Sequence, residues 1–195
     1  MRFSFAVLER LEEEVEKVQE RARKVTAILD QHGIPYQIIG GIAVYSWIVV
    51  TDPIAARNTQ DVDISVRRED LPRVQTALAE AGYRYNETLG VKMLLEPGVQ
   101  RARDAIHIVI AGEKVRPEYA HAAPPIPDDP PRPGGEYAVI DLPSLVRMKL
   151  TSFRRKDQVH LLDLLGVGLI TPQIESSLPP DLMARLQELK DNPDG

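Results

Sequence analysis

The sequence predicts an α+β fold, α/β-like in its local order, with a small mixed sheet flanked by helices, a long N-terminal helix and a helical C-terminal part. Three observations support this fold class. Apolar residues recur at helical spacing over residues 8–29, strand-like and helix-like segments alternate between residues 36 and 112, and helical patterns return after residue 142. With 195 residues, the chain has room for one domain with an appendage.

The N-terminal helix carries an apolar stripe at spacings of three and four residues. Gly33 is suited to cap this helix, and Pro35 prevents its continuation. The stripe either joins two copies of the chain or packs within one chain against the C-terminal helices, which is the commoner use. We therefore expect a monomer, or a dimer through this helix. The stripe consists of Leu8, Leu11, Val15, Val18, Ala22, Val25 and Leu29.

The central region alternates between short strands and helices. A glycine pair, Gly40–Gly41, separates the first strand from a helix. In the strand at 61–67, polar and apolar side chains alternate, so Asp61 and Asp63 share one face. The predicted strands are 36–40, 61–67, 83–87, 91–96 and 104–112, and the predicted helices are 42–50 and 68–82.

A proline-rich segment divides the chain. Residues 116–135 are too rich in proline for regular structure, so we expect a connector there, either substrate-facing or a mere spacer. It separates a core at 1–115, including the N-terminal helix, from a helical part at 136–195 that packs on this core. Helices are expected from residue 142, over 156–168 and over 178–190.

Composition narrows the classes of function. The chain has no cysteine, which excludes disulfides, thiolate metal sites and cysteine nucleophiles and favours a cytoplasmic location. The longest apolar stretch, residues 38–50, is too short to span a bilayer, and the acidic N-terminal region is unlike a signal peptide. The net charge of −5 argues against broad nucleic-acid coating, although residues 147–156 are locally basic.

The glycine pair and the acidic pair together suggest a phosphate and metal site. Gly40 and Gly41 let the backbone approach a ligand, and the helix that follows offers free N–H groups to a phosphate. Asp61 and Asp63 lie on one strand face, where their charges repel unless a cation lies between them. Carboxylate oxygens suit Mg²⁺, which takes its remaining ligands from water and substrate phosphates.

The combination of Gly40–Gly41 with Arg57, Thr59, Asp61 and Asp63 in "RNTQDVDI" resembles the polymerase-beta-type nucleotidyltransferase superfamily, in particular its AbiE-toxin-like branch of minimal nucleotidyltransferases. The helical segment 145–165 also resembles that branch. This resemblance implies that an NTP is the substrate, that Mg²⁺ or Mn²⁺ is the cofactor, and that NMP is transferred to a hydroxyl while pyrophosphate leaves.

The resemblance also implies roles for individual residues. Asp61 and Asp63 bind the metal and are catalytic, and the nucleotide is bound by Gly40, Gly41, Arg57, Thr59, Lys149 and Lys156. Simpler uses remain open: Arg57 pairs with a carboxylate, Thr59 orders its loop, and the basic helix is a solvated face.

The third carboxylate of the superfamily is missing from its expected place. The resemblance implies that His107 occupies that position. Strand periodicity agrees, because His107 faces away from the isoleucine row of the strand. Three alternatives follow: His107 is the catalytic base, Asp104 is recruited through an irregular strand start, or catalysis is lost and binding is kept. His107 is a poor ligand for Mg²⁺ and a better one for Mn²⁺.

The sequence therefore predicts a nucleotidyltransferase-like protein whose acceptor is a protein, a tRNA or a small molecule. The first alternative is a catalytically impaired nucleotide- or partner-binding module, related to toxin–antitoxin pairs. The second is a helical scaffold that associates through residues 8–29.

Overall fold

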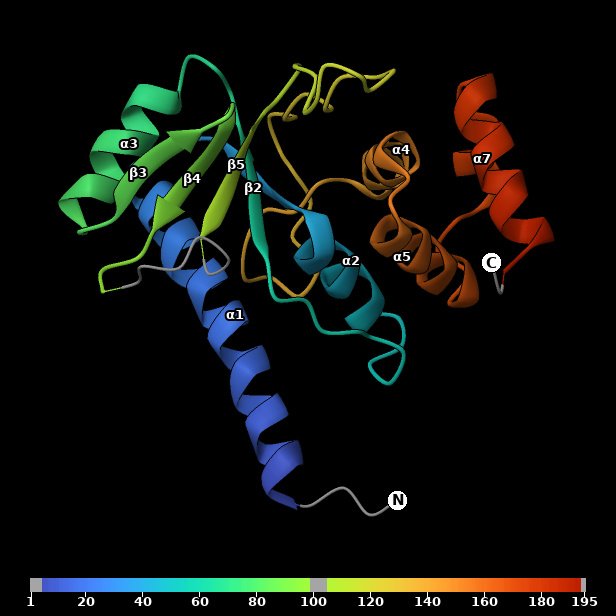
Figure 1. Cartoon of the computed structure of the whole chain (residues 1–195), viewed down its shortest axis with the longest axis horizontal. Coiled ribbons are helices and arrows are strands. Elements are labelled where there is room, and N and C mark those ends of the chain that lie inside the picture. The colour runs from blue at the N-terminus through green and yellow to red at the C-terminus, as the bar shows by residue number, and fades with distance from the viewer. Residues whose placement is uncertain (1–4, 99–104, 194–195) are drawn as a thin grey trace.

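The computed structural model describes residues 5–98 and 105–193, with side chains from residue 16 onwards. The described strands form one mixed sheet in the order β1-β2-β5-β4-β3 (Figure 1). The strands are β1 (Tyr36–Ile39), β2 (Val62–Val66), β3 (Arg84–Thr88), β4 (Val91–Leu95) and β5 (Ile106–Ile110). The α+β fold expected from the sequence is confirmed.

The strand register places the predicted polar face of β2 beside β5. β2 runs antiparallel to β1 and parallel to β5, so that Asp63 lies opposite Ile39 on one side and His107 on the other. The apolar side chains of β2 are fully buried on the opposite face, as their alternation predicts. The two central strands, β2 and β5, therefore have one apolar face, and their other face carries the carboxylate of Asp63 beside the imidazole of His107.

The helices lie on both sides of this sheet (Figure 1). α1 and α3 lie on one side, where α1 contacts α3 and β2 and α3 contacts β3. On the other side α2 packs on β1 and β2, α4 and α5 pack on α2, and α7 packs on α4. The helices are α1 (Phe5–Gln31), α2 (Gly40–Val49), α3 (Leu71–Glu80), α4 (Leu142–Ser152), α5 (Arg155–Gly166), α6 (Pro172–Ser176) and α7 (Pro180–Asp191).

The expectation that α1 packs against the C-terminal helices is wrong. The main contacts of α1 are with α3 and β2 rather than with a C-terminal helix, and its buried side chains, from Val18 to Leu29, lie there. The apolar face of the sheet needs a helical cover, and the stripe of α1 supplies it. The remaining members of the stripe, at residues 8–15, lie outside the described side chains, so a dimer through them stays a prediction.

The proline-rich segment is irregular, and its end returns to the sheet. Ile38 donates its N–H to the carbonyl of Ala138 at 2.8 Å, and Ile140 donates to the carbonyl of Ile38 at 2.9 Å. Trp47 of α2 also donates to the carbonyl of Ile140, at 3.0 Å. The start of the C-terminal part is thereby fixed beside β1. None of the described helices is both long and apolar enough to cross a membrane.

Candidate active site

The turn between β1 and α2 packs closely against β2 and the loop before it. Gly40 has a φ of +71°, which side chains rarely adopt, and a Cβ added to it would collide with the Asp63 carboxylate, whose Cγ would be only 2.9 Å away. A Cβ added to Gly41 would collide with Thr59, whose own Cβ would be 2.7 Å away. Both glycines are therefore required by close packing against the segment that carries the carboxylates.

The first turn of α2 leaves its N–H groups available. The helix starts without a side-chain cap, because Ile39 occupies the capping position. The first N–H groups of a helix have no partner within the helix, and they lie at its positive end. This positive end begins at Gly40, in contact with Asp63.

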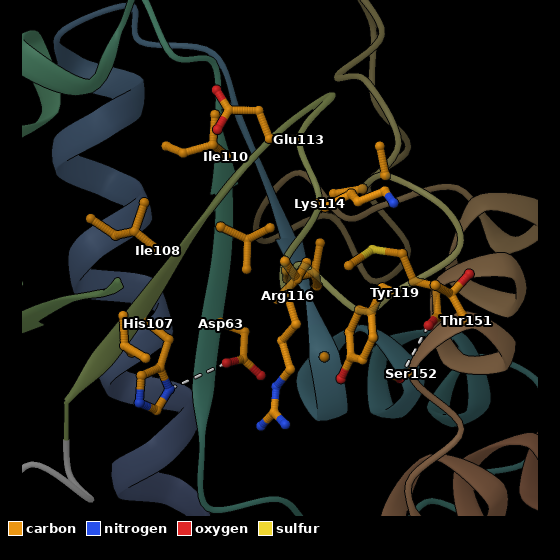
Figure 2. Close-up of a pocket in the computed structure, with 18 of the residues that line it drawn as sticks. Asp63, His107, Ile108, Ile110, Glu113, Lys114, Arg116, Tyr119, Thr151 and Ser152 are labelled. Atoms are coloured by element: carbon orange, nitrogen blue, oxygen red, sulfur yellow. Dashed lines mark hydrogen bonds and ion pairs between the residues drawn. The ribbon is translucent and has the colours of Figure 1, made fainter. Parts of the chain in front are cut away.

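Each carboxylate of the acidic pair faces a basic group. Lys156 of α5 donates to Asp61 Oδ2 at 3.2 Å, and His107 Nδ1 lies 3.3 Å from Asp63 Oδ1 (Figure 2). The side chains of Asp61 and Asp63 remain 37% and 25% exposed, so both are accessible from solvent. The charge of Lys156 thus offsets part of the repulsion that the sequence predicts for this pair, and His107 adds to this in its protonated form.

His107 projects to the same side of the sheet as Asp63. The parallel pairing of β2 and β5 places the two residues opposite each other, and the imidazole is half-buried. The hydrogen bond with Asp63 raises the pKa of His107, burial opposes this, and the charges of Asp63 and Asp61 add to the increase. The imidazole is therefore more cationic than an ordinary histidine. Asp104, the alternative third carboxylate, lies outside the described residues.

A cavity of about 800 Å³ opens over this group of residues (Figure 2). The predicted site residues that line it are Gly40, Asp61, Asp63, His107, Lys149 and Lys156. Its remaining walls come from the ends of β4 and β5, the loop after β5, and the helices α4 and α5. The structure therefore places a glycine turn, two carboxylates and several basic groups around one space.

Comparison with protein families shows which family this chain belongs to. Residues 4–124, more than half of the chain, match the model of an uncharacterised nucleotidyltransferase family. The chain belongs to this family. No curated protein matches it significantly.

One of two similar solved structures supports the nucleotidyltransferase fold. A nucleotidyltransferase-like antigenic protein from Paracoccidioides brasiliensis is similar over 94% of this chain and 90% of its own, with 17% identity and a TM-score of 0.53. The structure of ANT(2'')-Ia in complex with adenylyl-2''-tobramycin aligns with 86% of this chain and 95% of its own, with 13% identity and a TM-score of 0.49. At these identities the first similarity shows the fold alone.

Lys149 lines the cavity of this member of the nucleotidyltransferase family, but its ammonium is engaged in a buried ion pair. It donates to Asp157 Oδ1 at 3.1 Å, and the two side chains are only 6% and 1% exposed. Asp157 also accepts from Arg154 at 2.7 Å and from Ser152 at 2.8 Å. Burial lowers the pKa of Lys149, an effect that the charge of Asp157 opposes. This network joins α4 to α5 across Phe153, which has a left-handed φ of 47°.

Three predicted nucleotide-binding residues are not among the cavity-lining residues. Gly41 and Thr59 pack on each other beside the turn. Arg57 donates to Asp163 Oδ1 of α5 at 2.9 Å, and thereby connects the loop before β2 to the C-terminal helices. In this structure Arg57 and Thr59 order the loop that carries the carboxylates.

Arg116 and Tyr119, in a loop that forms one wall of the cavity, were not predicted as site residues. The loop at 113–123 contributes most of its residues to the lining, including Arg116 and Tyr119. It lies mostly within the segment expected to be a connector, where a substrate-facing loop was only one of two possibilities. An arginine and a tyrosine shortly after the end of a strand were the available signal.

The acidic pair fits a divalent ion that a nucleotide helps to bind. Asp61, directly before β2, and Asp63, within β2, are accessible carboxylates that line the same cavity. Mg²⁺ commonly takes one or two carboxylates together with substrate phosphates. No group of three or more potential metal ligands occurs among the described residues. Such an ion would therefore need ligands from a bound triphosphate or from water, and it would compete with Lys156 and His107 for the carboxylates.

Proposed function

We propose that this protein transfers NMP from an NTP to a hydroxyl acceptor, with Mg²⁺ or Mn²⁺ bound by Asp61 and Asp63. The observation that carries the proposal is the contact of Gly40 with Asp63, because it joins a phosphate-accepting helix start to a metal-binding carboxylate at one edge of a cavity. Family membership supports the class of reaction.

The residues of the site have separate roles in this transfer. The free N–H groups at the start of α2 bind phosphate oxygens of the NTP, and Lys156 offsets negative charge beside Asp61. When bound, a divalent ion neutralises phosphate charge and polarises the reacting oxygens. The acceptor oxygen forms a bond to the α-phosphorus, and the bond from that phosphorus to the pyrophosphate oxygen breaks. Neutral His107 accepts the hydroxyl proton, and pyrophosphate leaves with the electron pair.

Calorimetric titration with each NTP, with and without Mg²⁺ or Mn²⁺, tests the binding step. Asp61→Asn and Asp63→Asn should each abolish metal-dependent binding. Asp129→Asn, which removes an exposed carboxylate from the connector, is the matched control and should bind like wild type. Equal metal-dependent binding in all three variants would contradict the proposal.

Transfer of a labelled α-phosphate then tests the chemistry. Candidate acceptors from the three open classes are protein hydroxyls, tRNA ends and small hydroxylated molecules, each offered with the NTP that binds best. The cytoplasmic location and the AbiE-like branch belong to the same proposal, and they predict that the acceptor is a cytoplasmic molecule. Binding without transfer to any acceptor class would favour the second candidate function.

That second candidate is a nucleotide- or partner-binding module without catalysis, for example one member of a toxin–antitoxin pair. One observation favours it: His107 occupies the expected position of the third carboxylate, and its contact with Asp63 favours the protonated form, which cannot accept a proton. His107→Asp separates the two candidates. The substitution should lower transfer if His107 is the working base, and it should create or raise transfer if the site has lost its carboxylate.

A further inference from the structure

The loop at 113–123 is closed at its base and lies against the cavity. Gly112 donates its N–H to the carbonyl of Ala123 at 2.9 Å, and Ala123 donates to the carbonyl of Glu113 at 2.8 Å. Compact loops of this length with adjacent ends are frequently functional. Near the C-terminal end of the loop, His121 lies 2.7 Å from Asp181 of α7, so the loop is held both at the end of β5 and by a helix.

Most cations around the cavity already have a carboxylate partner. Lys149 and Arg154 share Asp157, and Lys156 pairs with Asp61. The cations at the other end of the cavity are also paired, Arg68 with Glu113 and Lys92 with Glu87. Among the cavity-lining residues that the structure describes, Lys114 and Arg116 are the two lysine or arginine residues without a hydrogen bond to a carboxylate.

Arg116 and Lys114 point in different directions. Figure 2 shows the guanidinium of Arg116 extending across the cavity to the level of Asp63, with Tyr119 on its other side, whereas the ammonium of Lys114 points away from Asp63. The Arg116 side chain is 55% exposed, and its nearest carboxylate, on Glu118, lies 3.8 Å away within the same loop. The Tyr119 ring centroid lies 5.9 Å from the guanidinium, within the range of a cation–π contact.

We propose that Arg116 binds the polyphosphate of the nucleotide, so that the loop at 113–123 supplies the cation which the core of the site lacks. The inference rests on the proposed function, because it places a triphosphate between α2 and the loop. A guanidinium suits this position because its planar set of donors matches the geometry of phosphate oxygens. Arg116 has a long ion pair with Glu118 but no hydrogen bond to that carboxylate, so it can bind the anion without breaking a hydrogen bond to a carboxylate.

Titration with inorganic tripolyphosphate and Mg²⁺ tests the inference separately from base recognition. Arg116→Ala should weaken tripolyphosphate and NTP binding by a similar factor, about 10-fold or more, because a charge-assisted hydrogen bond is lost. Arg116→Lys should restore only part of the affinity. The loop is exposed and its base is formed by backbone groups, so the thermal unfolding of these variants should match wild type.

Lys114→Ala is the matched control, because it removes the same charge from the same loop. It should change tripolyphosphate affinity by less than about twofold, given the direction of its side chain. An equal loss in both variants would show that only the net charge of the loop matters and would overturn the inference. Unchanged affinity in Arg116→Ala, with binding abolished in Asp61→Asn, would overturn the inference while leaving the proposed function intact. Failure of the wild-type protein to bind either anion would overturn both.

Tyr119 is a positioning residue in this scheme, and a double-mutant cycle tests that role. Tyr119→Leu should weaken tripolyphosphate binding in the wild-type background and have no further effect in Arg116→Ala, because the ring acts through the guanidinium. Tyr119→Phe, which keeps the ring, should retain the affinity. Equal effects of Tyr119→Leu in both backgrounds would exclude the positioning role.

Discussion

The carboxylate of Asp63 occupies the space that a side chain on residue 40 would need. The turn that starts α2 and the strand that carries the acidic pair are therefore held at the distance that only glycine permits. Their relative position is set by close packing within the folded core. Any larger residue at position 40 must displace the carboxylate or the turn.

Gly40→Ala should damage the site through this contact. We expect a loss of metal-dependent NTP binding and a decrease of about 2–3 kcal/mol in the free energy of unfolding, since the variant combines left-handed strain with a collision. Urea denaturation and calorimetric titration measure the two effects.

The control for this substitution is Gly168→Ala. Gly168 has a similar φ of +73°, but its added Cβ would meet nothing within 4 Å. This variant should lose about 1 kcal/mol to backbone strain and keep its NTP affinity. Equal NTP binding in the two alanine variants would contradict the role given to the Gly40–Asp63 contact.

The buried ion pair of Lys149 and Asp157 should respond asymmetrically to substitution. Asp157→Asn leaves the ammonium of Lys149 buried without a counter-charge, so we expect a loss of about 3–5 kcal/mol in the free energy of unfolding. Lys149→Met should lose less, because Asp157 keeps its hydrogen bonds from Arg154 and Ser152. Urea denaturation of both variants at neutral pH gives the comparison.

A different outcome for Lys149→Met would restore its assignment as a phosphate ligand. If the free energy of unfolding is unchanged while NTP affinity falls tenfold or more, the ammonium must leave Asp157 when the nucleotide binds. If both variants are equally destabilised, the network depends on the pair itself and Arg154 contributes little.

Stability should fall in mildly acidic solution because of His160. Burial, followed by the charge of Lys149, lowers the pKa of His160 from 6.5 to about 4. The unfolded chain therefore takes up a proton that the folded protein excludes, and stability is lost as the pH falls from about 6.5 to about 4. For a half-buried ring we expect a loss of about 2 kcal/mol over this interval.

His160→Leu should remove this pH dependence. The difference in the free energy of unfolding between wild type and the variant is measured by urea denaturation at several pH values between 7.5 and 4. The difference should be constant above pH 7 and should shift in favour of the variant below it. A difference that stays flat to pH 4 would show that His160 is protonated normally in the folded protein.

Arg57→Ala should affect stability more than nucleotide binding. The Arg57 side chain is mostly exposed and is not among the described residues that line the cavity, but its partner Asp163 is only 12% exposed. We expect about 1–3 kcal/mol of destabilisation, because a largely buried carboxylate loses its partner, and a less than twofold change in NTP affinity, measured by denaturation and titration. A tenfold loss of affinity with unchanged stability would instead support the nucleotide-binding role that the family resemblance implies.

Periodic segments made most of the fold predictable from the sequence. The alternation in β2 and the isoleucine row of β5 gave the buried faces, because side chains alternate along every strand. The glycine pair identified α2 although its residues are β-branched, since a helix with apolar residues on all sides is stable when it is buried. The proximity of Gly40, Asp63 and His107 followed from the same patterns.

Contacts between distant segments could not be read from local patterns. The stripe of α1 shows that this helix packs against an apolar surface, but it does not show which surface. The sequence alone therefore could not distinguish packing on the sheet from packing on the C-terminal helices. The pairing of Lys149 with Asp157 depends on the left-handed Phe153 between two helices, a conformation that its residue type does not suggest. Arg116 and Tyr119 lie in a proline-rich segment without periodicity, where side-chain direction is set only by tertiary structure.

The two ends of the loop at 113–123 are joined at its base by backbone hydrogen bonds, and this closure is useful for protein engineering. Because two backbone hydrogen bonds close this base at the end of β5, most of the intervening residues could be exchanged for a sequence of different length without changing the strand order of the sheet. Grafted or randomised versions of this segment would then be a practical library for altering which molecules the protein accepts, while the scaffold beneath it is kept constant.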